Sequence, residues 1–180
     1  MPKFEVEVEG TSPLLMHRYI GKDVGKKVGK LMAKEQASIY AYRVDPEDDT
    51  SNLAANGFWF RGALIESFVQ NAGKNLVTKT KTEVQPALQI MEALIDLGTK
   101  TFSINEQIIP VKKAGKIADM TVCIRPELKN WKCTFTLESL LNLPDKEIHD
   151  ELIRAGRNCG VGSARPMGNG RFKVTSFKKI

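Results

Sequence analysis

The stretch NCGVGSARPMGNGRF, residues 158–172, concentrates glycine and arginine in a way that suits phosphate binding. Glycine lets a backbone N–H approach an anion closely, and a guanidinium binds phosphate oxygens in pairs. The stretch therefore predicts a phosphate-binding loop made of Arg157, Gly160, Gly162, Arg165, Gly168, Gly170 and Arg171. The same residues also fit a helix that ends at Gly160 and continues into an ordinary long turn.

The common nucleotide-binding motifs do not account for this loop. The glycines follow a predicted helix rather than a strand, so they are not a dinucleotide-binding fingerprint, and the sequence has no G-x-x-x-x-G-K-[ST] run. An enzyme that binds mononucleotides or dinucleotides is therefore disfavoured.

His17, in LLMHRY, is the residue that best suits acid-base chemistry, and Arg18 follows it. His149, the other histidine, occupies a helix surface in EIHDEL. Acid-base catalysis needs oriented partners, which the sequence around His17 does not supply. We therefore expect a non-enzymatic protein, in which His17 and Arg18 contact nucleic acid. If the protein is an enzyme instead, His17 is the candidate catalytic residue.

No cofactor and no metal site are expected. Cys123, Cys133 and Cys159 lack CxxC spacing and suit reduced, buried thiols. The acids between 45 and 49 follow a proline in one turn-like stretch without EF-hand spacing, which favours a solubilising loop. The chain opens with alternating residues and contains no long apolar run, which favours a cytoplasmic location.

Composition favours one globular domain with a polyanionic partner. The 180 residues are 42% hydrophobic and 27% charged, with a net charge of +6. Two segments contribute many of the lysines: one around Lys22, Lys26 and Lys27, and one, KNLVTKTKTEVQP, around Lys79 and Lys81. The second alternates threonine with lysine and predicts an extended arm, although such charge runs are commonly solvated surface.

The periodicity predicts an alternation of strands and helices. Strands are predicted at 3–10, 58–60, 117–126, 131–138 and 170–177, with 117–126 paired antiparallel to 131–138. Helices are predicted at 31–42, from 61 to Gly73 and at 143–160. The short apolar runs at 87–98 fit either another helix or a buried strand. Without insertions at about 20–56 and 74–118, the order is β-α-β-β-α-β. This predicts an α+β, ferredoxin-like or RRM-like domain over 1–180, with four antiparallel strands and two helices.

Three stretches in order resemble the RAMP superfamily, the RRM-fold proteins of CRISPR effector complexes: GTSPLLMH (10–17), FRGALIES (60–67) and the glycine-rich loop before the last strand. With a single RRM-like unit, the chain looks most like a small backbone-subunit member of the kind found in phages and mobile elements. The resemblance implies that Arg61 lies near RNA and that the two insertions contact the strand as finger and thumb.

Phe58, Trp59 and Phe60 could stack on bases, as aromatic residues of RRM domains do. Core packing is the stronger interpretation for at least two of them.

The resemblance and the basic residues together predict an RNA-binding protein that assembles along a guide-type or other single-stranded RNA through phosphate contacts, in an RNA-guided ribonucleoprotein. Such binding leaves some bases available to pair with a target nucleic acid. Self-association along the RNA is part of this prediction. Two alternatives remain: a metal-independent endoribonuclease using His17, and a phage-type single-stranded DNA-binding protein, for which basic grooves and aromatic residues look alike.

Overall fold

A four-stranded antiparallel sheet forms the centre of the fold, in the order β4-β8-β1-β9. The structure is a computed structural model that describes residues 2–71, 81–113 and 115–180. The strands of this sheet are β1 (Lys3–Gly10), β4 (Leu88–Ile90), β8 (Lys132–Ser139) and β9 (Phe172–Lys179). In β1 the alternation buries Phe4, Val6 and Val8, and leaves the intervening glutamates on the opposite face.

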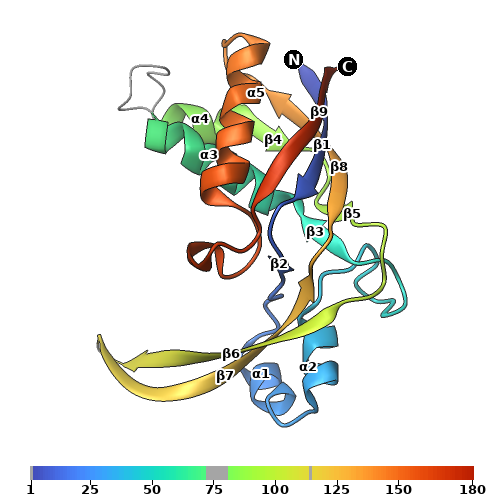
Figure 1. The fold of residues 1–180 in the computed structure, drawn as a ribbon, viewed down its shortest axis with the longest axis vertical. Helices are drawn as coiled ribbons and strands as arrows, with labels where there is room; N and C mark the ends of the chain where they lie inside the picture. Colours follow the sequence, from blue (N-terminus) through green and yellow to red (C-terminus); the bar gives the residue numbers. More distant parts are fainter. Residues whose placement is uncertain (1, 72–80, 114) are drawn as a thin grey trace.

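Two helices cover the apolar face of this sheet: α3 (Gly57–Asn71) and α5 (Asp145–Arg154) (Figure 1). Phe60, Leu64 and Phe68 of α3 and Ile148 and Leu152 of α5 are buried in one core with the strand residues. The order β1-α3-β4-β8-α5-β9 confirms the predicted α+β, RRM-like unit with two helices on one face.

A buried carboxylate links the two helices. Glu151 of α5 is fully buried and accepts hydrogen bonds from Ser67 Oγ at 2.8 Å and Asn71 Nδ2 at 3.0 Å, both on α3. It also pairs with the guanidinium of Arg154. Every oxygen of this charged group thus has a partner, as a charge inside a protein requires.

The strand predicted at 117–126 exists, but its predicted pairing is wrong. It is part of β7 (Lys116–Leu128), which pairs with β6 (Ser103–Lys113) in a long hairpin and with the short β2 (Leu14–Leu15). The second strand of the RRM-like unit is β4, which was not predicted for that role. The reason is visible in burial: β8 buries alternate residues, whereas exposed Met120 and Val122 give β7 no comparable core face.

The aromatic strand predicted at 58–60 is also wrong, because these residues open α3. The backbone N–H of Phe58 donates to Asn56 Oδ1 at 2.9 Å, so the asparagine that ends β3 (Ala54–Asn56) caps the helix. For residues 87–98 the helix is wrong and the strand alternative holds. The segment contains β4 and β5 (Leu94–Asp96), and β5 pairs with β3.

Part of the predicted arm at 74–86 is helical. Lys81–Ala87 forms α4, whose Val84 is buried, so this part is packed rather than extended. The rest of the predicted arm, residues 74–80 with Lys79, lies outside the described residues. The helix predicted at 31–42 is confirmed as α2 (Ala33–Tyr40), and α1 (Lys22–Val28) forms despite Gly25.

The two long connections of the unit lie together below the main sheet in Figure 1. Residues 11–56 join β1 to α3 and carry β2, α1, α2 and β3, whereas residues 91–131 join β4 to β8 and carry β5 and the β6–β7 hairpin. Strand β2 links both connections because it pairs with β7 at the base of the hairpin.

Candidate nucleic-acid interface

The glycine loop, defined here as residues 160–171, follows a π-helical turn (Ala155–Cys159) at the end of α5. Gly160, Gly162, Gly168 and Gly170 all have positive φ, between 70° and 86°. A Cβ at position 170 would lie 1.8 Å from the carbonyl oxygen of Val161, and one at position 162 would lie 2.6 Å from that of Leu15. Glycine is therefore required at these two positions for both conformation and space.

Several N–H groups of the glycine loop donate to carbonyls of the protein itself. Val161 N–H bonds to Gly170 O at 2.9 Å, Gly170 N–H to Pro13 O at 2.8 Å, and Ser163 N–H to Leu15 O at 2.8 Å. These three donors hold the loop against the segment around β2, so a phosphate cannot use them in this conformation. The arginines are further groups that suit phosphate.

The two arginines of the loop and Arg157, in the turn just before it, differ in availability. Arg157 is exposed. Arg165 makes an ion pair with Glu66 of α3 at 3.0 Å, in which both side chains are more than 40% exposed, so a phosphate can compete for it. Arg171 is half-buried, and its NH1 atom is buried without a hydrogen-bond partner among the described residues. Arg157 and Arg165 are thus the accessible cations.

The loop and residues 11–19, here called the β2 segment, form one surface. Arg171 N–H donates to Ser12 Oγ at 2.8 Å, and Thr11 N–H donates to Arg171 O at 2.8 Å. The sequence singled out this loop and the stretch 10–17 separately, and the structure brings them together (Figure 1). His17 and Arg18 therefore lie two and three residues after Leu15, where the glycine loop contacts β2.

His17 lies beside α2 and β7. Its imidazole stacks on the ring of Tyr40, with centroids 4.4 Å apart and planes 16° apart, and the residue as a whole is exposed. Partial burial and the nearby Arg125 guanidinium lower the pKa of His17 below its usual value. His17 is thus neutral at neutral pH. His149 packs on Phe177 instead, between α5 and β9.

Arg61 and Lys81 line one hollow together with Glu66, the ion-pair partner of Arg165. Arg61 donates from Nε to Leu88 O at 2.7 Å and from NH2 to Gln85 O, so its guanidinium joins α3 to α4 and β4. Lys22, Lys26 and the exposed Lys27 belong to α1, and the exposed Lys81 begins α4; these helices lie at opposite ends of the molecule (Figure 1).

Of the three aromatic residues Phe58, Trp59 and Phe60, two pack against other aromatic rings of the protein, as the core-packing interpretation predicts. Phe60 is buried against Phe135, at 4.7 Å between ring centroids, and Trp59 makes an edge contact with Tyr42 at 5.0 Å. Phe58 alone of these three is exposed.

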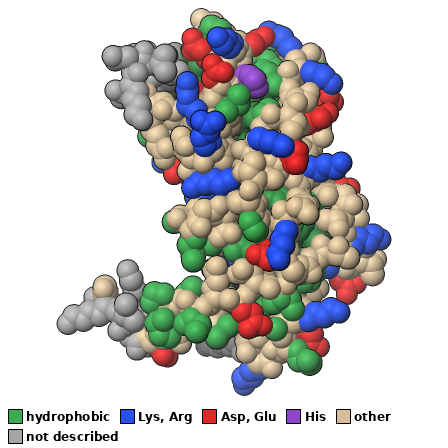
Figure 2. All heavy atoms as spheres, in the orientation of Figure 1, with side chains coloured by type: hydrophobic (Ala, Val, Ile, Leu, Met, Phe, Trp, Pro, Cys, Tyr) green, Lys and Arg blue, Asp and Glu red, His purple; other side chains and the backbone are tan. Residues whose placement is uncertain are grey.

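An exposed apolar face on the β6–β7 hairpin was missed from the sequence. Ile108 and Val122 lie opposite each other in register and are 69% and 56% exposed, and Met120 beside them is 55% exposed. Figure 2 shows hydrophobic side chains gathered on the projecting hairpin, with the surface hollowed between it and the rest of the molecule. The sequence did contain a signal for this face: Met120 and Val122 are two positions apart, and residues two apart in a strand lie on the same face.

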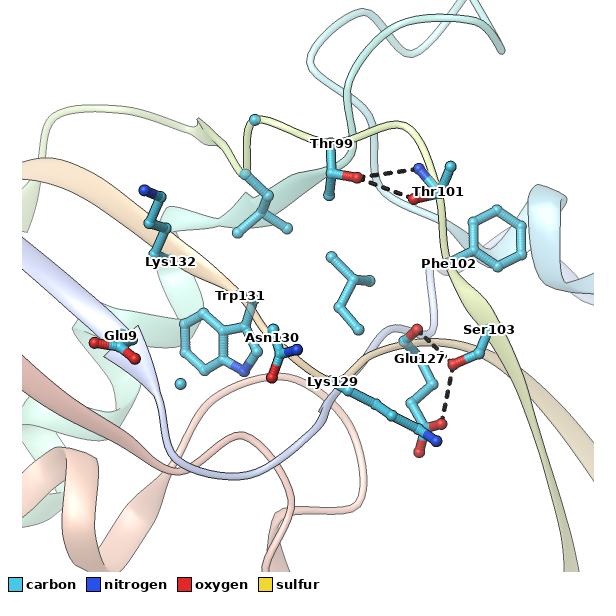
Figure 3. Close-up of a pocket in the computed structure, with 14 residues that line it drawn as sticks. Glu9, Thr99, Thr101, Phe102, Ser103, Glu127, Lys129, Asn130, Trp131 and Lys132 are labelled. Atoms are coloured by element: carbon cyan, nitrogen blue, oxygen red, sulfur yellow. Dashed lines mark hydrogen bonds between the residues drawn. The ribbon is translucent and has the colours of Figure 1, made fainter.

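A hollow of about 820 Å³ lies where β1, β8 and the β5–β6 connection meet (Figure 3). Its lining mixes apolar Trp131 and Phe102 with Glu127, which accepts a hydrogen bond from Ser103 Oγ at 3.1 Å. It contains none of the residues predicted for nucleic-acid binding. Among the described residues, no group of three or more His, Cys, Asp or Glu could hold a metal ion.

Within the described part of the chain, no helix combines the length and the apolar character needed to cross a membrane.

No protein-family model and no curated protein matches this chain. Among solved structures, it is similar to a chain in the cryo-EM structure of the Type III-B Cmr-beta bound to cognate target RNA, with a TM-score of 0.58 and 14% identity. The match covers 99% of this chain and 60% of that chain, so this protein spans three fifths of that chain's length. It confirms the RAMP-like fold. The crystal structure of Cmr6 from Pyrococcus furiosus also matches, at a TM-score of 0.48 and 9% identity, over 97% of this chain and 98% of that one.

Proposed function

We propose, from a fold shared with a chain of the RNA-bound Cmr-beta structure, that this protein is a RAMP-like RNA-binding subunit that assembles along a guide-type single-stranded RNA. The observation that carries the proposal is the joined surface of the glycine loop and the β2 segment. In our proposal this surface offers Arg157, Arg165, Arg18 and His17 to the RNA, which are residues that the sequence also predicted for nucleic-acid binding.

The opposite face of the main sheet is unsuited to RNA. Glu5, Glu7 and Glu9 alternate along β1 on the face away from the helices, where many RRM domains carry base-stacking aromatics. Glu9 is paired with Lys173 at 3.0 Å, whereas Glu5 and Glu7 add carboxylates, which repel phosphates. The proposed RNA path therefore follows the glycine loop and the β2 segment.

RNA binding should weaken steeply with salt, because phosphate contacts release counterions. The double variant Arg157→Ala/Arg165→Ala should bind a labelled single-stranded RNA about tenfold more weakly at low salt, and its plot of log K against log salt should be shallower by about 1.4, since each lost contact removes about 0.7. Fluorescence anisotropy at several salt concentrations measures both.

The matched control is Lys129→Ala/Lys132→Ala, which removes two exposed cations on the side of the hollow in Figure 3. Equal losses in the two double variants would contradict the proposed surface. The same assay with a DNA strand of equal sequence decides between RNA and DNA: equal affinity for DNA would favour the single-stranded DNA-binding alternative.

The projecting β6–β7 hairpin, rather than residues 74–86, is the element that we propose reaches a neighbouring copy on the RNA. Copies joined head to tail form an open array when the rotation between them does not close. Light scattering with RNAs of increasing length should show a stoichiometry that grows with length. Ile108→Ser/Val122→Ser should reduce this growth, whereas Met91→Ser, at an exposed apolar residue outside the hairpin, should not. A single copy on every RNA would refute the assembly.

The endoribonuclease alternative is favoured by one observation: a neutral His17 beside Arg125 could act as a general base near a cation. Under our proposal, purified protein leaves end-labelled RNA intact over hours with a chelator present. Cleavage by the wild-type protein that disappears in His17→Ala would establish the alternative instead.

A further inference from the structure

Tyr19 is the most exposed large hydrophobic side chain among the described residues, with 82% of its surface accessible. No described aromatic ring contacts it, although most other aromatic side chains of the protein pack in pairs. It lies two residues beyond His17, which is also exposed. A tyrosine in this position contributes nothing to the core.

The backbone that carries both rings follows directly after β2 and is held at two points. Met16 N–H donates to Pro126 O of β7 at 3.1 Å, and Arg18 N–H donates to Tyr40 O of α2 at 2.9 Å. Met16 is fully buried, whereas His17 and Tyr19 are both exposed and Arg18 between them is intermediate. This alternation of burial is the one an extended chain produces.

The spacing of the two residues matches a nucleobase. Residues i and i+2 of an extended chain are roughly 6.6 to 6.8 Å apart. Neighbouring nucleotides of one strand are about 3.4 Å apart along the helix axis, so two rings that keep the spacing of their Cα atoms would leave room for one base between them. The Tyr40 ring stacks on one face of His17, so the base would stack on the opposite face.

We propose that His17 and Tyr19 form a base-stacking subsite that takes one unpaired base of the single-stranded RNA. This rests on the proposed function and extends it from phosphate contacts to contacts with bases. The subsite continues from the glycine loop, because Ser163 N–H bonds to Leu15 O just before it. The lowered pKa of His17 keeps the imidazole neutral, as a stacking platform for a neutral base. Stacking tolerates any base, since every base has a π-face.

The test compares a labelled single-stranded oligouridylate of about 20 nucleotides with an oligomer of the same length in which the central riboses are abasic. Wild-type protein should bind the oligouridylate about tenfold more tightly than the abasic oligomer, because the abasic riboses have no base to stack on the aromatic rings. Tyr19→Ala should bind both oligomers with the weaker affinity, and Tyr19→Phe should restore the preference. Phe58→Ala, at an exposed aromatic on another element, should behave as wild type.

Unchanged preference in Tyr19→Ala, with RNA still bound, would overturn the subsite and leave the proposed function standing. No binding of either oligomer by the wild-type protein would overturn the proposed function itself. Circular dichroism of each variant checks folding, which an exposed position such as 19 should not disturb.

Discussion

Gly170→Ala is expected to lower the free energy of unfolding by about 4 kcal/mol or more, and the melting temperature by about 10 °C. A Cβ at this position would lie 1.8 Å from Val161 O and 2.7 Å from its carbonyl carbon, both backbone atoms, and the φ of +71° is unfavourable for alanine. The loop would have to leave Val161, and the bond from Gly170 N–H to Pro13 O would break with it. Urea unfolding measures the loss.

Gly168→Ala separates the two causes. Gly168 has a similar φ of +86°, but a Cβ there meets nothing within 4 Å. This variant should lose only the conformational term of about 1 to 2 kcal/mol. Equal losses in Gly168→Ala and Gly170→Ala would show that close backbone packing does not hold the glycine loop in place.

Glu151→Ala should destabilise the protein by about 3 to 5 kcal/mol, because it removes the shared partner of three polar groups between α3 and α5. Ser67, Asn71 and Arg154 all bond to this fully buried carboxylate. Its loss leaves a buried hydroxyl and a cation without their partner. Chemical unfolding of the purified variant gives the value.

Glu66→Ala is the control for this change. Glu66 also pairs with an arginine, Arg165, but its side chain is 45% exposed, so its removal should cost less than about 1 kcal/mol. The prediction fails if the two glutamate variants are equally stable.

The longer strands and helices could be predicted because burying one face of such an element makes apolar residues recur at regular intervals in the sequence. Phe4, Val6 and Val8 recur every second residue, and Ile148 and Leu152 recur at helical spacing, so β1 and α5 were recognisable from one sequence. Three-residue strands such as β4 and β5 show no period. Their identity comes from partners far away in sequence, as Leu88 pairs with Ser139. The aromatic run at 58–60 suggested a strand because the cap at Asn56 was overlooked.

The site was predicted in part for a similar reason. The glycine loop and the stretch 10–17 each carry a local signal, and their contact follows from the fold. The role of Arg61 could not be predicted, since whether a guanidinium faces solvent or the carbonyls of Gln85 and Leu88 depends on a helix 24 or more residues away. Tyr19 gave no signal by itself, because exposure is a property of the folded chain.

The bond between Arg171 N–H and Ser12 Oγ joins residues 159 positions apart, and strand β1 also depends on β9 for one of its two neighbours. Such distant pairings form slowly, because loop closure must precede them. During synthesis, the proposed binding surface cannot exist until the ribosome has released the glycine loop and β9. The β2 segment is therefore synthesised long before the glycine loop that completes the proposed binding surface. RNA that contacts both the β2 segment and the glycine loop would stabilise the contact between them by mass action, so RNA binding would also favour the last step of folding.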